Sequence, residues 1–369
     1  MVKWCIIRAK FPTYKGSLMK IAINGFGRLG RAIARAALAK GVEIVGVNDI
    51  ANSENLAYLF EKDSMHGALG QSVRFKQGSP YNALVIEPKC QDQALQDLST
   101  KQAPLAPREI PLFSCANPLE LDFGALGAEV VVESSGLFLR SSDVAHHLDK
   151  GVKRVIISAP ATDDTATFVL GVNHTAYSGQ QIISNASCTT NCLAPIAMVL
   201  EREFGIDRAS LTTIHSYTND QSLLDVAHAS DKRRSRAAGL NIIPTSTGAA
   251  KALYKVLPSL KDKIHGHSVR VPVADVSMVD LSAYLSQKVD SSVINELFEA
   301  ESKGALKGIL GIDSSYGVSS DFINDTRSAI IAQDLSFTLG NMCKVMAWYD
   351  NEWGYAHRII DIAHYVLAR

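Results

Sequence analysis

The chain has 369 residues, a length that suggests two domains, and its 47% apolar and 20% charged residues are typical of a globular protein rather than a disordered one. Lys and Arg number 37, as do Asp and Glu, so the formal net charge is zero, which argues against a general nucleic-acid binder. No stretch approaches the ~20 apolar residues of a membrane span, so the sequence indicates no dedicated nucleic-acid or membrane partner.

The N-terminal segment 1–18 carries no clear element of the fold, and we interpret it as an extension or a start placed too early. Its apolar run, Trp4 to Ile7, is shorter than the ~7–15 residues of a secretory signal, which favours a cytoplasmic protein. The six cysteines have no framework spacing and are interpreted as reduced thiols rather than a disulfide scaffold.

The first regular elements form a strand–helix–strand unit. An apolar strand is predicted over residues 19–24, a helix over 28–40 and a second strand over 42–47, which together imply parallel strands. Further apolar runs at 129–132 and 155–158 predict more strands of the same sheet. The expected architecture of this part is a Rossmann-type, doubly wound parallel sheet.

The composition and the hydrophobic pattern change in the rest of the chain. Six prolines between residues 71 and 121 favour short, irregular strands and loops. From residue 182 the strands lengthen and alternate, which predicts a second α+β domain with a mostly antiparallel or mixed sheet. We therefore expect a Rossmann-type domain over 19–187, a second domain over 188–351, and a closing helix over 352–369 that packs back on the first domain.

A glycine-rich turn follows the first strand. Gly25, Gly27 and Gly30 form the G-x-G-x-x-G pattern that lets a pyrophosphate approach the backbone at a helix N-terminus. Asp49 follows Gly30 by 19 residues, where a carboxylate binds an adenosine ribose and repels a 2′-phosphate. The pattern predicts NAD rather than NADP; the alternative is a glycine turn with a capping aspartate.

A candidate nucleophile lies in the segment SNASCTTNCLAP. Cys188 has small polar neighbours and precedes a helix-forming run, so the helix dipole is expected to lower its pKa. Cys192, one turn deeper, fits a buried and inert thiol. A metal site at these two cysteines lacks a second ligand pair, so no metal is expected.

The expected base is His215, in the strand TIHSYTND; alone it could equally be a structural histidine. Thr247 and Gly248 open a helix in PTSTGAAK and suggest a phosphate site, with Arg236 and Arg270 as candidate phosphate ligands. The other charges of the DKRRSR run are expected to face solvent.

These motifs resemble one family, the phosphorylating glyceraldehyde-3-phosphate dehydrogenases. The resemblance extends from Met19 to the C-terminus and rests on INGFGRLGR, SNASCTTNCLAP, TIHSYTND, LNIIPTSTGAAKAL, RVPVADVSMVDL and WYDNEWGY. It implies a glycolytic oxidoreductase that converts D-glyceraldehyde 3-phosphate, NAD and inorganic phosphate to 1,3-bisphosphoglycerate through a cysteine thioester. It also implies a homotetramer, with residues 217–241 crossing between subunits.

The resemblance assigns site residues by their match to the family motifs. The implied catalytic pair is Cys188 and His215. The implied cofactor-binding residues are Asn24, Gly25, Phe26, Gly27, Arg28, Leu29, Gly30, Asp49, Ser158, Asn351 and Tyr355. The implied ligands of inorganic phosphate and of the substrate are Ser187, Thr189, Thr218, Arg236, Thr247, Gly248 and Arg270.

Some positions depart from the family pattern. Residues 71–121 match poorly, and Val226 and Ala227 stand where NAD-specific members often carry Leu-Pro, so small side chains leave room for a 2′-phosphate. Two related functions stay open at this point: erythrose-4-phosphate dehydrogenase and a non-catalytic nucleotide- or RNA-binding relative.

Overall fold

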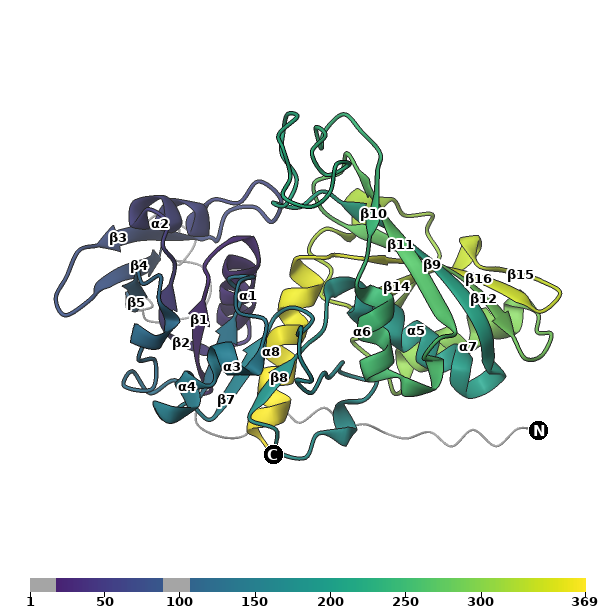
Figure 1. Ribbon diagram of the computed structural model, residues 1–369, viewed down its shortest axis with the longest axis horizontal. Helices are drawn as coiled ribbons and strands as arrows, with labels where there is room; N and C mark the ends of the chain where they lie inside the picture. Colours follow the sequence, from purple (N-terminus) through teal and green to yellow (C-terminus); the bar gives the residue numbers. More distant parts are fainter. Residues whose placement is uncertain (1–17, 89–106) are drawn as a thin grey trace, which may run out of the picture.

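The computed structural model describes residues 18–88 and 107–369, so predictions for residues 1–17 and for 89–106 lie outside the described residues. Two lobes, each built on a twisted sheet, stand side by side, and the C-terminal helix α8 (Trp353–Leu367) runs between them (Figure 1). No helix of the described residues is long and apolar enough to cross a membrane.

The first lobe contains an eight-stranded sheet in the order β3-β4-β5-β2-β1-β6-β7-β8. From β5 to β8, every neighbouring pair of strands is parallel, as the strand–helix–strand pattern predicts. In sheet order the strands are β3 (Gln71–Lys76), β4 (Asn82–Pro88), β5 (Arg108–Phe113), β2 (Glu43–Asn48), β1 (Lys20–Asn24), β6 (Val130–Glu133), β7 (Arg154–Ile157) and β8 (Ile182–Ser184).

Helices cover both faces of this sheet. Ile21 and Ile23 of β1 belong to a core cluster shared with α1 and α8, whereas Ala22 between them belongs to a second cluster with Val144 of α3. Alternate residues of one strand are therefore buried on opposite faces, which confirms the doubly wound prediction. The helices of this lobe are α1 (Arg28–Ala39), α2 (Ser53–Glu61), α3 (Ser141–Val144) and α4 (His146–Asp149).

The expectation of short strands and loops over residues 71–121 is confirmed for the described part, but the strands are regular and paired rather than irregular. Strands β3, β4 and β5 pair antiparallel and extend the parallel sheet at one edge. Two of the prolines lie at positions that leave the pairing between strands intact. Pro88 is the last residue of β4, and Pro111 precedes the only two residues of β5 that pair with β2. Proline is tolerated at such positions because no sheet hydrogen bond needs its missing N–H.

The second lobe contains a mixed sheet in the order β10-β11-β9-β12-β16-β14-β13, with β15 paired to β16. The apolar run over 267–286 is interrupted at Pro272–Val276, where Val276 has a φ of 64°, so it contributes to two strands. The strands are β9 (Ile206–Ser216), β10 (Ile243–Ser246), β11 (Ile264–Val271), β12 (Ser277–Leu285), β13 (Leu310–Asp313), β14 (Ala329–Ala332), β15 (Phe337–Leu339) and β16 (Met342–Tyr349).

Three helices pack on this second sheet: α5 (Cys188–Phe204), α6 (Ala249–Val256) and α7 (Ser291–Lys303). Helix α5 is the central one, and its residues share a core cluster with α8 and with β9, β12 and β16. One continuous hydrophobic core thus joins α5 to the first lobe. This packing holds the start of α5 near the carboxyl ends of the strands in the first sheet. The predicted domain boundary at residues 187 and 188 stays a prediction.

A buried histidine in the first lobe, His147, makes stability depend on pH. His147 has 0% exposure, and its two ring nitrogens have no hydrogen-bond partner among the described residues. Burial, with His146 and Lys150 nearby, lowers the pKa of His147 to about 3. An unfolded chain would bind this proton near the ordinary histidine pKa of ~6.5, so stability is complete above that pH and falls as the pH drops toward 3.

We therefore expect His147→Leu to flatten the loss of stability in acid, by up to about 1.4 kcal/mol per pH unit between ~6.5 and 3. Urea unfolding between neutral pH and the lowest pH at which the protein stays folded measures this slope. His265→Leu, at an exposed position of β11, is the matched control and should keep the wild-type slope. Equal slopes for wild type and His147→Leu would contradict the account.

Candidate active site

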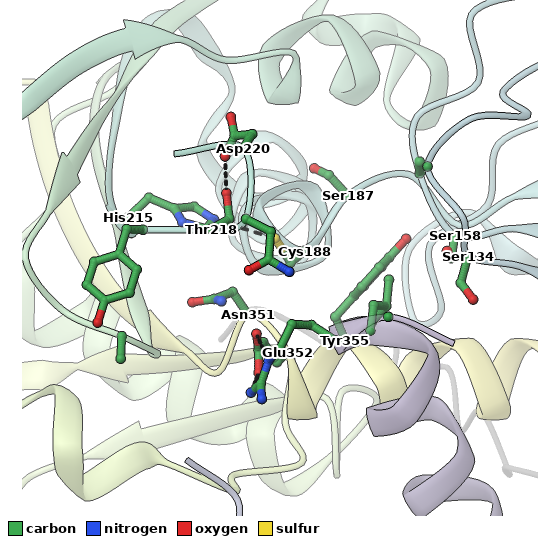
Figure 2. Close-up of a pocket in the computed structure, with 18 of the residues that line it drawn as sticks. Ser134, Ser158, Ser187, Cys188, His215, Thr218, Asp220, Asn351, Glu352 and Tyr355 are labelled. Carbon is green, nitrogen blue, oxygen red and sulfur yellow. Dashed lines mark hydrogen bonds and ion pairs between the residues drawn. The ribbon is translucent and has the colours of Figure 1, made fainter. Parts of the chain in front are cut away.

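A cavity of about 990 Å³ is lined by residues of both lobes and by the start of α8. Figure 2 shows Ser134 and Ser158 on one side of it and Cys188, His215 and Thr218 on the other. A smaller cavity of about 210 Å³ adjoins it. Both cavities are lined by Pro160, Ser187, Cys188, His215 and Arg234.

The glycine turn forms part of the wall of the larger cavity. Gly25 has a φ of +91°, and a Cβ there would lie 2.4 Å from the Ser135 nitrogen; a Cβ on Gly30 would lie 2.1 Å from the Gly25 carbonyl oxygen. A Cβ on Gly27 would meet nothing within 4 Å, and Gly27 lines the cavity with Arg28 and Leu29. The first and third glycines allow close packing, and the second exposes backbone to a ligand, as a pyrophosphate site requires.

Three of the predicted cofactor residues support this turn without lining the cavity. The Asp49 Oδ2 accepts a hydrogen bond of 2.7 Å from the Phe26 N–H. The Asn24 Nδ2 donates to the Glu133 Oε2 at 2.6 Å, which ties the end of β1 to β6. Asp49 therefore stands at the turn, at the end of β2, and its role toward a ribose stays a prediction.

Asn351 lies at the inner end of the larger cavity and is held in one orientation. Its Oδ1 accepts hydrogen bonds from the Ser216 hydroxyl at 2.9 Å and the Ser277 hydroxyl at 2.6 Å. Because the oxygen is occupied by two donors, the amide N–H groups are the part left for a ligand. Ser158 also lines this cavity, its hydroxyl donating to the Glu133 carbonyl at 2.8 Å.

The candidate nucleophile begins α5. Ser187 is the N-cap, and its side-chain oxygen accepts from the Thr190 N–H at 3.1 Å, so the helix begins at Cys188 as the sequence predicts. The Cys188 sulfur lies 3.6 Å from the His215 Nε2. Residues 27 positions apart in the chain thus form the thiol–imidazole pair that nucleophilic cysteine chemistry needs.

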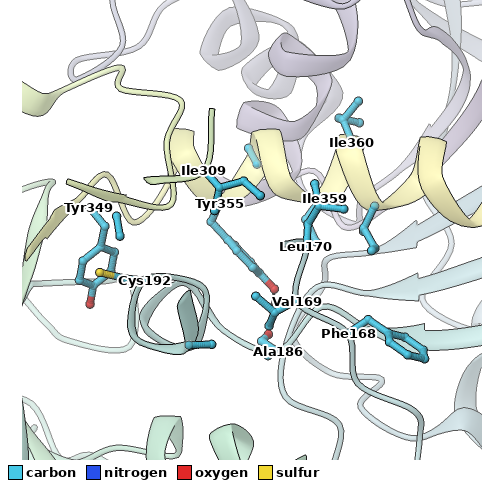
Figure 3. Packing of buried hydrophobic residues seen from close by; sticks show 14 of the residues in the cluster. Phe168, Val169, Leu170, Ala186, Cys192, Ile309, Tyr349, Tyr355, Ile359 and Ile360 are labelled. Carbon is cyan, nitrogen blue, oxygen red and sulfur yellow. Dashed lines mark hydrogen bonds between the residues drawn. The ribbon is translucent and has the colours of Figure 1, made fainter. Parts of the chain in front are cut away.

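The core beneath the pair keeps the second cysteine out of reach. Cys192 has 0% exposure, and burial raises its pKa well above the usual value. Figure 3 shows Cys192 beside Tyr349 and places Tyr355 of α8 against Ala186, whose carbonyl accepts the Tyr355 hydroxyl at 2.8 Å. The prediction that Cys192 is buried is confirmed.

The protonation of the pair differs from the expectation. Burial raises the pKa of the Cys188 thiol, although the Arg270 charge and hydrogen bonds involving Thr189 oppose this. Burial and the Arg270 charge lower the pKa of His215 to about 3. The prediction of a helix dipole that lowers the Cys188 pKa is wrong for the ligand-free cleft, because desolvation outweighs it. At neutral pH the pair is a thiol facing a neutral imidazole.

The tautomer of His215 follows from its other ring nitrogen. Nδ1 lies 2.8 Å from the Ser216 carbonyl oxygen and 2.6 Å from Arg270 Nη1, and it cannot both donate to the first and accept from the second. Arg270 Nη1 also donates to the Ser216 carbonyl at 2.9 Å. We assign the proton to Nδ1, which donates it to the Ser216 carbonyl oxygen. The Nε2 lone pair then faces the Cys188 sulfur, and the same hydrogen bond to Ser216 persists when Nε2 is protonated during the reaction.

The smaller cavity has the features of an anion site. Thr247 and Gly248 line it where α6 begins, and Ser187, Thr189 and Arg270 line it as well. Free N–H groups at a helix start and an arginine attract phosphate-sized anions. Thr218 lies on the wall of the larger cavity instead. The structure thus brings the predicted phosphate ligands around Cys188, with one exception.

That exception is Arg236. It is exposed, pairs with Asp225 at 3.0 Å and lines neither cavity, so its prediction as a phosphate ligand is wrong for this structure. Arg234, from the same run, lines both cavities and is held by the Thr245 hydroxyl at 2.8 Å and by Asp220 at 2.9 Å. The segment is irregular, so no periodicity in the sequence could say which arginine faces the site.

Comparisons with known proteins agree with the geometry. The family model described as the NAD-binding domain of glyceraldehyde 3-phosphate dehydrogenase matches residues 19–141, and that of its C-terminal domain matches residues 187–351. A Helicobacter pylori glyceraldehyde-3-phosphate dehydrogenase is 49% identical over 358 residues, covering 94% of this chain and 99% of that protein. Glyceraldehyde-3-phosphate dehydrogenase 1 of Bacillus cereus is 46% identical, covering 95% and 99%.

The glyceraldehyde-3-phosphate dehydrogenase 1 of Bacillus subtilis is 46% identical, with 94% of this chain and 98% of that protein covered. The open backbone at Gly27 and the fixed amide of Asn351 fit a dinucleotide, and the NAD-binding family model covers the glycine turn, so the cofactor is NAD. With both lobes matched and full-length relatives at nearly half identity, the chain belongs to the glyceraldehyde-3-phosphate dehydrogenase family.

Proposed function

We propose that the protein oxidises D-glyceraldehyde 3-phosphate to 1,3-bisphosphoglycerate with NAD and inorganic phosphate, with Cys188 as the nucleophile and His215 as acid and base. The observation that carries this proposal is the contact of 3.6 Å between the Cys188 sulfur and the His215 Nε2, at the point where the two cavities meet. The thiol has the aldehyde-binding and cofactor cavity on one side and an anion cavity on the other.

In the first half of the reaction, the Cys188 sulfur is acylated by the substrate. Cys188 adds to the aldehyde carbon while His215 Nε2 removes the thiol proton and passes it to the carbonyl oxygen, which gives a hemithioacetal. His215 then takes the hydroxyl proton as the carbon loses hydride, and NAD, when bound, supplies the acceptor for that hydride. The product on Cys188 is a thioester, which keeps the acyl group activated.

In the second half of the reaction, inorganic phosphate binds in the smaller cavity and releases the acyl group. Inorganic phosphate, held by Ser187, Thr247 and Gly248, attacks the thioester carbon, and the protonated His215 returns its proton to the departing sulfur. Thr218, Arg270 and Arg234 are proposed to hold the phosphate of the substrate, with Arg234 in place of Arg236. Arg234 suits this role because it faces both cavities.

Replacing Arg234 by leucine should lower kcat/KM for the aldehyde and for phosphate at least tenfold each, since a hydrogen bond to a charged group contributes about 1.5–3 kcal/mol. Arg236→Leu is the matched control two residues away, with the same loss of charge, and should stay close to wild type. Steady-state kinetics with each substrate varied separately gives both values. A larger defect in Arg236→Leu would reverse the assignment.

The activity itself is tested by following NADH absorbance with the purified protein. NADH should form with glyceraldehyde 3-phosphate and should depend on inorganic phosphate, because release of the thioester requires that nucleophile. Erythrose 4-phosphate is assayed in parallel and should be the poorer substrate. A preference for erythrose 4-phosphate, or NADH formation that ignores phosphate, would contradict the proposal, and no activity would favour a non-catalytic relative.

Cofactor preference is expected to depend on the charge of Asp49. A carboxylate at the ribose position repels a 2′-phosphate, so wild type should prefer NAD over NADP, although the small Val226 and Ala227 leave space. Asp49→Ala and Asp49→Asn should each shift the kcat/KM ratio toward NADP by about tenfold or more, a change of ~1.4 kcal/mol. Asp49→Asn retains an oxygen for the Phe26 N–H, so it separates the charge from the stability of the turn. Equal use of both cofactors by wild type would contradict this role.

We also propose a homotetramer in the cytoplasm. The segment 217–241 exposes three leucines almost completely, Leu223 at 84%, Leu224 at 71% and Leu240 at 80%, which favours cover by another subunit. A reducing compartment keeps free thiols such as Cys188 reduced, which favours the cytoplasm. Sedimentation equilibrium of the wild type should give four times the chain mass.

A further inference from the structure

A cluster of charged side chains lies at the edge of the larger cavity, which two of its members, Arg28 and Glu352, line. The proposed chemical steps assign no role to its acidic side chains or to its histidine. The cluster forms where the turn after α2, the segment between β11 and β12, and the start of α8 meet, close to the cavity-lining residues Met65 and Ala274. Its members are Arg28, Asp63, His66, Asp275, Asp350 and Glu352.

Most members of the cluster are fully paired. Arg28 donates to the Asp63 Oδ2 at 2.8 Å and to both carboxylate oxygens of Glu352, with Nε 3.0 Å from Oε1. Asp350 accepts from the backbone N–H of Asn324 at 2.8 Å and from those of Glu352 at 3.0 Å and Trp353 at 2.5 Å.

His66 is held between two oxygen atoms. Its Nδ1 lies 2.8 Å from the Asn324 Oδ1, and its Nε2 lies 3.0 Å from the Glu352 Oε2. The side chain of His66 is 1% exposed, so a charge on this ring is screened by protein groups rather than by water. With Nδ1–H donated to Asn324, Nε2 is the ring atom free to exchange its proton for another cation.

Asp275 is the exception in the cluster. It is 1% exposed, and neither carboxylate oxygen has a hydrogen bond of normal geometry among the described residues. The backbone N–H of Val276 lies near the carboxylate, and Oδ2 lies 3.8 Å from the His66 Nε2. Burial beside Asp350 and Glu352 raises the pKa of Asp275 to about 8. Even with His66 protonated, two cationic side chains face four acidic ones. An ionised Asp275 therefore gives the cluster excess negative charge at a buried position whose ion-pair partner, His66, is 3.8 Å away.

We propose that Asp275, His66 and Glu352 bind one divalent transition-metal cation. Their candidate ligand atoms all lie within 4.8 Å of one another. The His66 Nε2 is 3.0 Å from the Glu352 Oε2 and 3.8 Å from the Asp275 Oδ2. In a tetrahedral site with metal–ligand bonds of ~2.1 Å, two ligand atoms are ~3.4 Å apart, which lies between these two distances. The cation takes the position of the Nε2 proton and gives Asp275 a directly bonded partner.

The donor set selects the class of ion. One imidazole nitrogen with two carboxylate oxygens suits Zn²⁺, Mn²⁺ or Fe²⁺ better than Mg²⁺ or Ca²⁺, which prefer oxygen alone. Exchanging one proton for a divalent ion also removes one unit of the excess negative charge. The three ligands come from segments far apart in the chain, and His66 and Asp275 belong to no metal-ligand spacing in the sequence.

The test is a titration of the ligand-free wild-type protein with Mn²⁺ near pH 8, with free Mn²⁺ measured by electron paramagnetic resonance. Mn²⁺ is the probe because soft sulfur ligands such as that of Cys188 prefer other metals, and NAD is left out because its pyrophosphate binds Mn²⁺. Wild type should bind one Mn²⁺ per chain. Asp275→Asn and His66→Gln should each weaken binding by about tenfold or more, since even outer-shell partners of a metal site contribute 10–100-fold.

Asp280→Asn is the matched control. Asp280 lies on the neighbouring strand β12, is paired with Lys344 at 2.8 Å, and loses the same charge in the variant, yet it should leave Mn²⁺ binding unchanged. Circular dichroism and urea unfolding establish that each variant is folded, and Asp275→Asn keeps the shape of the side chain. Wild type without saturable Mn²⁺ binding, or Asp275→Asn with wild-type affinity, would overturn the proposal and would mean that Asp275 is buried as a neutral acid.

Discussion

Replacing Cys188 by serine is expected to lower kcat by at least about 10³-fold while NAD binding stays near the wild-type value. The sulfur is the atom that receives the acyl group, and a serine hydroxyl facing a neutral imidazole is a far weaker nucleophile. NADH formation measures the first effect and quenching of protein fluorescence by NAD the second. Cys115→Ser, at a half-buried cysteine in the first lobe, is the control and should keep full activity.

Alkylation gives an independent measurement of the same assignment. Iodoacetate should label Cys188 before Cys192, because Cys188 lines both cavities whereas Cys192 has 0% exposure and a pKa raised well above the usual value. Peptide mapping by mass spectrometry identifies the labelled residue. Equal labelling of the two cysteines, or an active serine variant, would exclude Cys188 as the nucleophile.

His215→Asn is expected to slow acylation by roughly 10²–10⁴-fold, the usual contribution of a positioned acid–base group. Because burial and Arg270 lower the pKa of His215 to about 3, the ring is a neutral base throughout the assay range. Burial raises the pKa of Cys188, so its alkylation should accelerate as the pH rises, and loss of the base should move that profile to still higher pH.

The matched control for this variant is His267→Asn, at an exposed position of the neighbouring strand β11, which should retain the wild-type rate and profile. Pre-steady-state NADH formation gives the acylation rate, and iodoacetamide, which is uncharged, gives the pH profile of the thiol. An unchanged rate together with an unchanged profile would mean that His215 has only a structural role.

The sequence predicted the features that depend on neighbouring residues. The glycine turn, helix α1 and the start of α5 at Cys188 follow from glycine spacing and helix propensity, which act over one or two turns of chain. The pairing of Cys188 with His215 was also anticipated, because the chemistry of a thiol nucleophile requires a base, and the structure places the two 3.6 Å apart.

The edge of the first sheet was not predicted. Strands β4 and β5 each contain a proline, which normally ends a strand, and local composition therefore suggested short, irregular strands and loops rather than a regular sheet edge. Only the register with neighbouring strands shows that these prolines sit where no sheet hydrogen bond is needed, as Pro111 does beside the short pairing of β5 with β2.

By itself, the sequence thus determined the two-lobed α/β class and the dinucleotide turn, and it predicted Cys188 as the reacting thiol, since each of these depends on a short run of residues. The tertiary structure alone decided that Arg234 rather than Arg236 faces the cavities, because an irregular segment has no period. It also decided that burial raises the pKa of Cys188 and lowers that of His215, and that Asp275 is buried beside His66. Desolvation and charge pairing depend on atoms brought together from distant parts of the chain.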